Sequence, residues 1–231
     1  MRVLLIGKNA KNIEKLIKDL GFEIVTLNPD LIITYGGDGT LLSAESQFPL
    51  IPKLPIRDSD ICKKCVDHQD EDVLKKLIKG ELKIKEYKKL ETEILFKKFY
   101  ALNDFVVRNF SPTHAIRFKV NGRFSIGDGI VISTPFGSTA YFRSVTGQTF
   151  EKGFSMAFNN TTEQIDPLFL KDGDTLTFQL TRGKATLSFD NSLDIFNIDE
   201  GSQLLFKLSD HVAKIYEDTS LRCPNCEVIR G

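Results

Sequence analysis

The N-terminal part of the chain alternates short apolar runs with segments of helical spacing. Val3–Ile6, Ile24–Leu27 and Leu31–Tyr35 have the length and composition of buried strands. Between and after them, apolar residues recur every three or four positions, as they do on the buried face of a helix. Helices that alternate with strands carry the chain back to the start of the next strand, so the strands run parallel. The pattern predicts a Rossmann-like parallel α/β domain.

Cap and stop residues mark where the helices of this part begin and end. The first helix is expected between Asn9, whose side chain can cap its N-terminus, and Gly21, which suits the left-handed position after its last turn. A second helix is expected to open over residues 41–45. A third is expected over residues 70–79, with Gly80 as its stop.

The second half of the chain is rich in strands. Asn121-Gly122 divides two alternating runs, and this dipeptide accepts the positive φ angles of a type I′ hairpin turn. One helix is expected to start at Ser138, with that serine as its N-cap. Many short strands joined by turns are typical of a β-sandwich. The expected strands are 115–120, 123–126, 175–181, 185–189, 193–198, 203–208 and 212–216, with Asp210 separating the last two.

Composition places a domain boundary and excludes some partners. The 18 phenylalanines cluster after position 90, which puts the boundary near residues 90–100. The 31 basic and 31 acidic residues cancel, so no charge excess favours a nucleic acid or an anionic membrane as partner. Apolar runs are too short to span a bilayer and no secretory signal pattern is present, so we expect a cytoplasmic protein.

A glycine-rich loop, Gly36-Gly37-Asp38-Gly39-Thr40, carries the strongest candidate chemistry. It follows the strand Leu31–Tyr35 and precedes an expected helix. Open α/β sheets bind ligands at this carboxyl edge, where glycines allow phosphate to approach and a helix N-terminus offers free N–H groups. Because a carboxylate repels phosphate, Asp38 would accept a proton from an attacking hydroxyl or order a metal ion. The alternative is a tight strand-to-helix turn without chemistry.

A second block begins with Gly127-Asp128-Gly129 and continues through Thr134-Pro135-Phe136-Gly137-Ser138-Thr139-Ala140-Tyr141. It puts small hydroxyl residues beside an expected helix start. Backbone N–H groups and hydroxyls of this kind can bind ribose or phosphate. Taken alone, the block is equally well explained as a capped helix.

Together these motifs resemble the NAD kinase family, whose members transfer the γ-phosphoryl group of ATP, or of polyphosphate in some cases, to the 2′-hydroxyl of NAD. The family's GGDG loop is matched by Gly36–Gly39, its Asn-Glu/Asp pair by Asn103-Asp104, and its GDG-(4 residues)-TP-x-GSTAY block by Gly127–Tyr141. Order and spacing agree over most of the chain. The sequence is therefore similar to a divergent family member, and an archaeal-type member is one reading.

The resemblance implies a role for each matching position. Asp38 would be the general base towards the 2′-hydroxyl of the ribose. Asn103 and Asp104 would hold the adenosine part of NAD, and Asp128 the nicotinamide end. His114 is a weaker match to a position that contacts the nucleotide, because a histidine at a strand end is more often structural. The other positions implied to bind NAD or nucleotide are Gly36, Gly37, Gly39, Thr40, Thr139, Ala140, Tyr141 and Ser144.

Cofactors, assembly and domain limits also follow from the resemblance. It implies ATP or polyphosphate as donor, with Mg²⁺ or another divalent cation to compensate the charge of the triphosphate. It implies a homodimer or homotetramer in which Thr139–Tyr141 and Ser144 line the NAD pocket across a subunit interface. The expected domains are an α/β domain over 1–96, joined by a returning tail over 217–231, and a dinucleotide-binding β-sandwich over 97–216.

The chain departs from the family's pattern in four segments. Residues 54–62 stand where the family has an Asn-containing, glycine-rich segment, and residues 144–147 where it has a Ser-Ala-Gly-Gly run. Residues 159–167 replace a Pro-His and Arg-Pro segment, and Asp190-Asn191-Ser192 replaces a late Asp-Gly-Gln. These changes leave Asp38 in place, but they keep a second hypothesis open, a non-catalytic NAD(P)-binding paralogue. A third is a diacylglycerol or sphingosine-type lipid kinase, since that superfamily shares the GGDGT loop but lacks the GSTAY block.

Four cysteines form two Cys-x-x-Cys pairs, Cys62 with Cys65 and Cys223 with Cys226. Two such pairs can hold a structural Zn²⁺ in a tetrahedral site. They are far apart in the sequence, but the returning tail of the resembling family would bring them together. Four reduced thiols or two disulfides are the alternatives.

Overall fold

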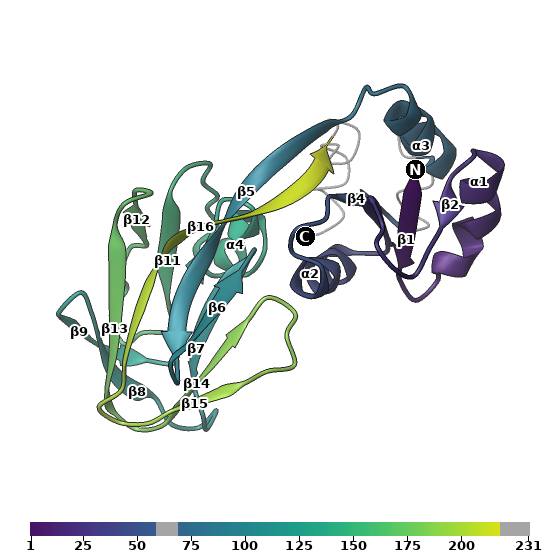
Figure 1. Ribbon diagram of the computed structural model, residues 1–231. Coiled ribbons are helices and arrows are strands. Elements are labelled where there is room, and N and C mark those ends of the chain that lie inside the picture. The colour runs from purple at the N-terminus through teal and green to yellow at the C-terminus, as the bar shows by residue number, and fades with distance from the viewer. Residues whose placement is uncertain (59–68, 218–231) are drawn as a thin grey trace. The chain divides into compact units, whose positions relative to one another are not determined.

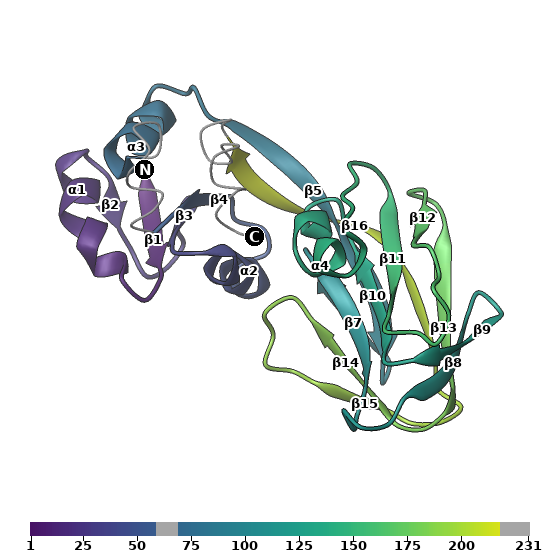
Figure 2. The same cartoon turned by 180° about the vertical axis from the view of Figure 1, so that it is seen from behind.

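The structure, a computed structural model, describes residues 1–58 and 69–217. The chain divides into two compact units (Figure 1), which Figure 2 shows from behind. The first comprises Met1–Tyr87 together with 213–217, and the second comprises Lys88–Val212. The chain passes from one unit to the other within β5 (Lys83–Ile94) and again within β16 (Gln203–Glu217). The limits 1–96, 97–216 and 217–231 stay a prediction, and residues 218–231 lie outside the described part.

The first unit is a parallel sheet with helices. Strands β1 (Arg2–Ile6), β2 (Glu23–Ile24), β3 (Leu31–Tyr35) and β4 (Lys53–Ile56) are parallel and lie in the order β2-β1-β3-β4. All residues of β3 are buried, as in a strand covered on both faces. The helical elements are the 3-10 turn η1 (Ala10–Ile13) and the helices α1 (Glu14–Asp19), α2 (Asp38–Gln47) and α3 (Asp70–Ile78).

Two expectations for the first unit are wrong in detail. Asn9 precedes the first helical turn but makes no capping bond, because its Nδ2 donates to Asp58 Oδ2 at 2.6 Å. The strand expected at Ile24–Leu27 is only Glu23–Ile24, because the chain bends after Val25 and leaves Leu27 78% exposed.

The second unit is a β-sandwich. One layer is an antiparallel sheet in the order β12 (Leu168–Leu170), β11 (Phe154–Asn159), β10 (Gly129–Ser133), β7 (Asp104–Asn109), β14 (Ala185–Phe189) and β15 (Phe196–Ile198). The other has the order β16, β13 (Thr175–Arg182), β8 (Ile116–Val120) and β9 (Arg123–Gly127), with β5 beside β16 and β6 (Lys97–Ala101) beside β5. A 3-10 turn η4 (Gly137–Thr139) and the helix α4 (Tyr141–Thr146) follow β10. The predicted fold class, α/β followed by a β-sandwich, is confirmed.

Apolar side chains from both layers form one core. Phe105 of β7 and Phe206 of β16 lie with ring centroids 5.6 Å apart, and Phe118 of β8 and Phe158 of β11 with centroids 6.4 Å apart. Core residues alternate along β8, where Ile116, Phe118 and Val120 are buried and the residues between them are exposed. Strand β10 is buried at every residue, because α4 packs against it on the face away from this core (Figure 2).

Three sequence-based expectations for this unit can be compared with its backbone. The Asn121-Gly122 hairpin is confirmed, with φ angles of 47° and 84°. The two strands expected on either side of Asp210 are one continuous strand, β16, because Asp210 points to solvent and does not interrupt the ladder. The strand expected from Leu193 begins only at Phe196, since Leu193 is 98% exposed.

Candidate functional site

The glycine-rich loop forms the turn between β3 and α2. The Gly36 N–H donates to the carbonyl oxygen of Ile56 at 2.9 Å, which ties the loop to the end of β4. A Cβ atom on Gly36 would lie 2.4 Å from Thr40 Oγ1, so the loop folds tightly onto the first turn of α2. Helix α2 begins at Asp38, three residues before the expected position. The N–H groups of this first turn point beyond the helix end, where an anion can bind them.

The loop lies at the point where the strand order of the sheet reverses. The connection after β1 leads to β2 on one side of it, and the connection after β2 leads to β3 on the other side. The carboxyl ends of β1 and β3 therefore flank a topological switch point. Gly7 follows β1, and a Cβ atom there would lie 2.1 Å from the carbonyl oxygen of Tyr35. The backbone after β1 therefore lies in close contact with the end of β3, directly before the glycine loop.

The Asp38 side chain is half exposed and is engaged by an arginine. Arg57 Nη2 donates to Asp38 Oδ1 at 2.9 Å, with side-chain exposures of 23% for Arg57 and 51% for Asp38. Sequence reasoning missed Arg57. Its position directly after β4 becomes a signal only when the strand order, which puts β4 next to β3, is known.

A buried ion pair joins the start of β4 to the last turn of α2, at the other ends of these two elements. Lys53 Nζ, on β4, donates to Glu45 Oε2 on α2 and to the carbonyl oxygen of Phe48 at 2.5 Å. The Lys53 and Glu45 side chains are 0% and 3% exposed. Because the pair joins α2 to β4, it fixes the helix that carries Asp38 relative to the strand that leads to Arg57.

In the second unit, Asn103 and Asp104 start strand β7 on a turn held by a carboxylate. Asp190 accepts the N–H groups of Leu102, Asn103 and Asp104 at 2.8, 2.7 and 3.3 Å. Desolvation raises the pKa of Asp104 to about 7, and the neighbouring Asp190 adds to the shift. Desolvation also raises the pKa of Asp190 to about 6, although the three N–H groups oppose it. Sequence reasoning assigned Asp190 no role.

The turn after β10 packs directly onto Asn103. Thr134 Oγ1 donates to the carbonyl oxygen of Leu102 at 2.5 Å and accepts the N–H of Gly137 at 3.1 Å. A Cβ atom on Gly137 would lie 2.3 Å from the carbonyl oxygen of Asn103, so only glycine allows this approach. The structure therefore brings the Asn103-Asp104 pair and the Thr134–Tyr141 block together. Ser138 is not an N-cap, because its Oγ donates to the carbonyl oxygen of Pro135 at 2.8 Å.

Asp128 lies at the other end of β10, within a cluster of amides. Asn109 Nδ2 donates to Asp128 Oδ1 at 3.1 Å, and Asn160 Nδ2 donates to Asp128 Oδ2 at 2.8 Å. Asn109 also donates to the carbonyl oxygen of His114 at 3.1 Å, so His114 belongs to this cluster through its backbone. A Cβ atom on Gly129 would lie 1.9 Å from the carbonyl oxygen of Val107, which explains the glycine after Asp128. The two amides were missed from the sequence.

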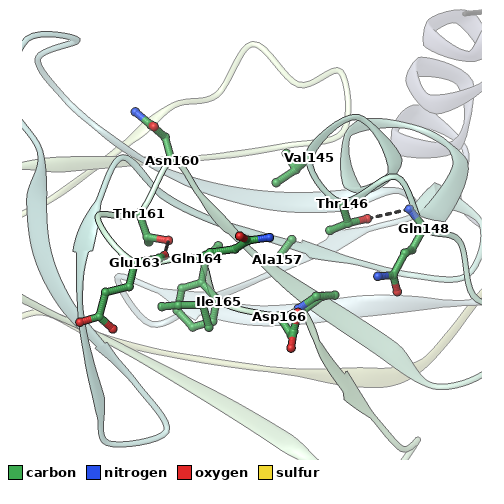
Figure 3. A pocket seen from close by; sticks show the side chains of 12 residues that line it. Val145, Thr146, Gln148, Ala157, Asn160, Thr161, Glu163, Gln164, Ile165 and Asp166 are labelled. Atoms are coloured by element: carbon green, nitrogen blue, oxygen red, sulfur yellow. Dashed lines mark hydrogen bonds between the residues drawn. The ribbon is translucent and has the colours of Figure 1, made fainter.

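A cavity of ≈ 380 Å³ adjoins the Asp128 cluster (Figure 3). It lies between the end of α4, strand β11 and the segment that follows β11. Asn160 lines the cavity and also donates to Asp128, so it connects the two. The cavity is lined by Val145, Thr146, Gln148, Ala157, Phe158, Asn160, Thr161, Glu163, Gln164, Ile165, Asp166 and Pro167.

The remaining candidate positions lie at the start of α4. Tyr141 OH accepts a hydrogen bond from Asn159 Nδ2 at 3.3 Å, on the strand that leads to the cavity. Ser144 Oγ donates to the carbonyl oxygen of Ala140 at 3.3 Å, within the helix. Thr139 ends the η4 turn. These contacts place the residues but assign them no ligand, so their roles stay predictions.

Comparison with known proteins gives the family. No family model matches the chain. The chain is 27% identical to the NAD kinase 2 of Bacillus cereus, covering 90% of this chain and 86% of that protein. It is 28% identical to the NAD kinase of Sulfurisphaera tokodaii, covering 89% and 88%. The crystal structure of an NAD kinase from Archaeoglobus fulgidus in complex with ATP superposes with a TM-score of 0.79 at 19% identity, covering 99% of both chains.

The chain is also 32% identical to the NAD kinase of Saccharolobus islandicus, covering 67% of this chain and 66% of that protein. The chain belongs to the NAD kinase family. The family predicted from the sequence is thereby confirmed, and its members include bacterial and archaeal proteins. Both halves of the family's motif set are present in the structure, the glycine loop in the first unit and the Asn103-Asp104 and Gly127–Tyr141 motifs in the second.

Two further expectations concern metals and membranes. The zinc ligands predicted at Cys62, Cys65, Cys223 and Cys226 lie outside the described residues. Among residues 1–58 and 69–217, no group of three or more His, Cys, Asp and Glu side chains could hold a metal ion. No helix in the same part of the chain is long and apolar enough to cross a membrane.

The raised pKa values of Asp104 and Asp190 predict a pH-dependent stability. Above about pH 4, an unfolded aspartate releases its proton. The folded protein keeps the proton on Asp190 up to about pH 6 and on Asp104 up to about pH 7. The folded state therefore binds more protons in this window, and the free energy of unfolding should fall as pH rises from about 4 to about 7.

Urea unfolding at a series of pH values measures this dependence. Asp104→Asn should flatten the slope of unfolding free energy against pH, because the amide does not titrate. Asp172→Asn, at a carboxylate whose side chain is 56% exposed, is the matched control and should leave the slope as in the wild type. Equal slopes for the wild type and Asp104→Asn would contradict the burial argument.

Proposed function

We propose that the protein phosphorylates the 2′-hydroxyl of the adenosine ribose of NAD, giving NADP, with ATP as the phosphoryl donor. The observation that carries the proposal is the position of Asp38, at the N-terminus of α2 and beside a glycine loop at the switch point of a parallel sheet. Backbone N–H groups there suit phosphate, and the carboxylate suits a hydroxyl that must lose its proton. Membership of the NAD kinase family supplies the substrates.

The proposed roles follow the polar groups of each unit. Asp38 accepts the proton of the 2′-hydroxyl. Asn103 and Asp104 hold the adenosine part of NAD, on a turn kept in place by Asp190. Asp128 and the adjoining cavity take the nicotinamide end. The positions proposed to complete the NAD site are Gly36, Gly37, Gly39, Thr40, His114, Thr139, Ala140, Tyr141 and Ser144.

A divalent cation, Mg²⁺ in the first instance, is part of the proposal. Mg²⁺ takes most of its ligands from phosphate oxygens and water, with one or two carboxylates from the protein. The described residues leave the cation to the donor's phosphates and water, because the half-exposed carboxylate at the loop, Asp38, is assigned to the hydroxyl proton. When bound, the cation neutralises charge on the donor's phosphates. A homodimer or homotetramer that completes the NAD pocket is also part of the proposal.

One assay tests the activity. Purified protein is incubated with NAD, Mg²⁺ and either ATP or polyphosphate, and NADP is measured with an NADP-specific dehydrogenase. NADP should accumulate with ATP. Absence of NADP from NAD, and of NADPH from NADH, with both donors would overturn the proposal.

The same preparation separates the alternatives. Tight NADP binding without turnover, measured by calorimetry, would identify a non-catalytic paralogue. Phosphorylation of diacylglycerol in place of NAD would identify a lipid kinase.

A further inference from the structure

The proposed general base is paired with a cation in the structure. Oδ1 of Asp38 accepts a hydrogen bond from Arg57 Nη2 at 2.9 Å. Both side chains are partly exposed, and pairs of this kind contribute little to stability. The guanidinium takes one of the lone pairs of Oδ1, so it competes with a ribose hydroxyl for this oxygen. The pair therefore bears on catalysis more than on folding.

Main-chain contacts place Arg57 beside the glycine loop independently of the ion pair. Arg57 is the residue after Ile56, whose carbonyl oxygen accepts the Gly36 N–H at 2.9 Å. Its side chain therefore starts at the carboxyl edge of the sheet, next to the N-terminus of α2. Phosphate oxygens that bind the first N–H groups of α2 come within reach of this guanidinium.

A guanidinium binds carboxylate and phosphate with the same planar arrangement of donors. We propose that Arg57 binds the transferring phosphoryl group of the donor, and that it exchanges the Asp38 carboxylate for this group when the donor binds. Oδ1 of Asp38 is then released to accept the hydroxyl proton when a phosphoryl group is in place. Arg57 lies in the segment 54–62 that departs from the family's pattern, so the exchange is a property of this chain.

The inference rests on the proposed function, a reaction in which NAD and ATP give NADP and ADP. The ribose O2′ forms a bond to the γ-phosphorus, the bond from that phosphorus to the leaving oxygen of ADP breaks with its electron pair, and the hydroxyl proton passes to the Asp38 carboxylate. Arg57 takes no proton. It offsets the negative charge of the non-bridging oxygens, as arginine does in other phosphoryl transfers.

Inorganic tripolyphosphate, titrated by calorimetry without divalent cations, tests the exchange without requiring turnover. Arg57→Gln should weaken its binding about tenfold or more, which corresponds to one hydrogen bond between charged groups. Asp38→Asn should strengthen it, because the competing carboxylate is removed. Arg57→Lys should fall between the wild type and Arg57→Gln, since it keeps the charge but not the planar donors.

The chain offers a matched control in the same unit. Arg2 Nη2 donates to Asp30 Oδ1 at 2.9 Å, at the start of β1, the opposite end of that strand from Gly7. Arg2→Gln removes an equivalent arginine–aspartate pair and should bind tripolyphosphate like the wild type. In the kinase assay, Arg57→Gln should raise the KM for ATP and leave the KM for NAD unchanged.

Two results would overturn the inference: an affinity for tripolyphosphate that is unchanged in Arg57→Gln, or one that is no tighter in Asp38→Asn. A wild-type protein that binds tripolyphosphate through Arg57 but forms no NADP would refute the proposed function and leave the phosphate site standing. Urea midpoints equal to that of the wild type confirm that the variants are folded.

Discussion

Asp38→Asn is expected to lower the kcat for NADP formation by about 10²- to 10⁴-fold, the usual contribution of a positioned general base. The amide keeps the size of the side chain and the N-terminus of α2, but it cannot accept the hydroxyl proton. Steady-state kinetics with NAD as the varied substrate measure the change. The KM for NAD should change little, because the lost interaction acts on the proton that leaves during the reaction.

The control for this variant is another aspartate in the first turn of a helix. Asp72 lies in the first turn of α3 and is exposed. Asp72→Asn also removes a negative charge near the positive end of a helix dipole. It therefore shows how much of any change in kcat comes from the loss of such a charge alone. Its kcat should equal that of the wild type. A kcat for Asp38→Asn within about tenfold of the wild type would mean that Asp38 is not the base.

The sequence predicted the glycine loop, the α/β and β-sandwich architecture and the family. These predictions rest on local signals: a buried strand followed by Gly36–Thr40 predicts a phosphate-binding turn whatever the order of the strands in the sheet. It could not predict Arg57 as the partner of Asp38. That contact depends on β4 lying next to β3, and only the strand order establishes it.

Asp190 shows the same limit in the second unit. Its carboxylate closes the turn at Asn103 and Asp104 across more than eighty positions of sequence. The signal in the sequence was only that Asp190-Asn191-Ser192 takes the place of the family's Asp-Gly-Gln. The capping assignments of Asn9 and Ser138 failed for a related reason. Each side chain had a competing partner, Asp58 or the carbonyl of Pro135, that no local pattern indicates.

Lys53 and Glu45 lead to the second large prediction, one of stability. Lys53→Met keeps the length of the side chain but leaves the Glu45 carboxylate buried without the ammonium group. Breaking a buried pair on one side costs about 3–5 kcal/mol, a large fraction of the stability of a domain. Urea unfolding should show a strongly lowered midpoint. Lys75→Met, which removes an exposed pair with Glu71, should leave the midpoint unchanged.

The double variant Glu45→Leu with Lys53→Met distinguishes loss of the pair from loss of packing. Two apolar side chains of similar volume fill the same space without a buried charge, so most of the lost stability should return. If it does not, the packing around Lys53 and its bond to the Phe48 carbonyl outweigh the ion pair. If stability returns but the kcat stays low, the pair serves mainly to orient α2. In that case Asp38 depends on this buried contact for its position relative to the phosphoryl group.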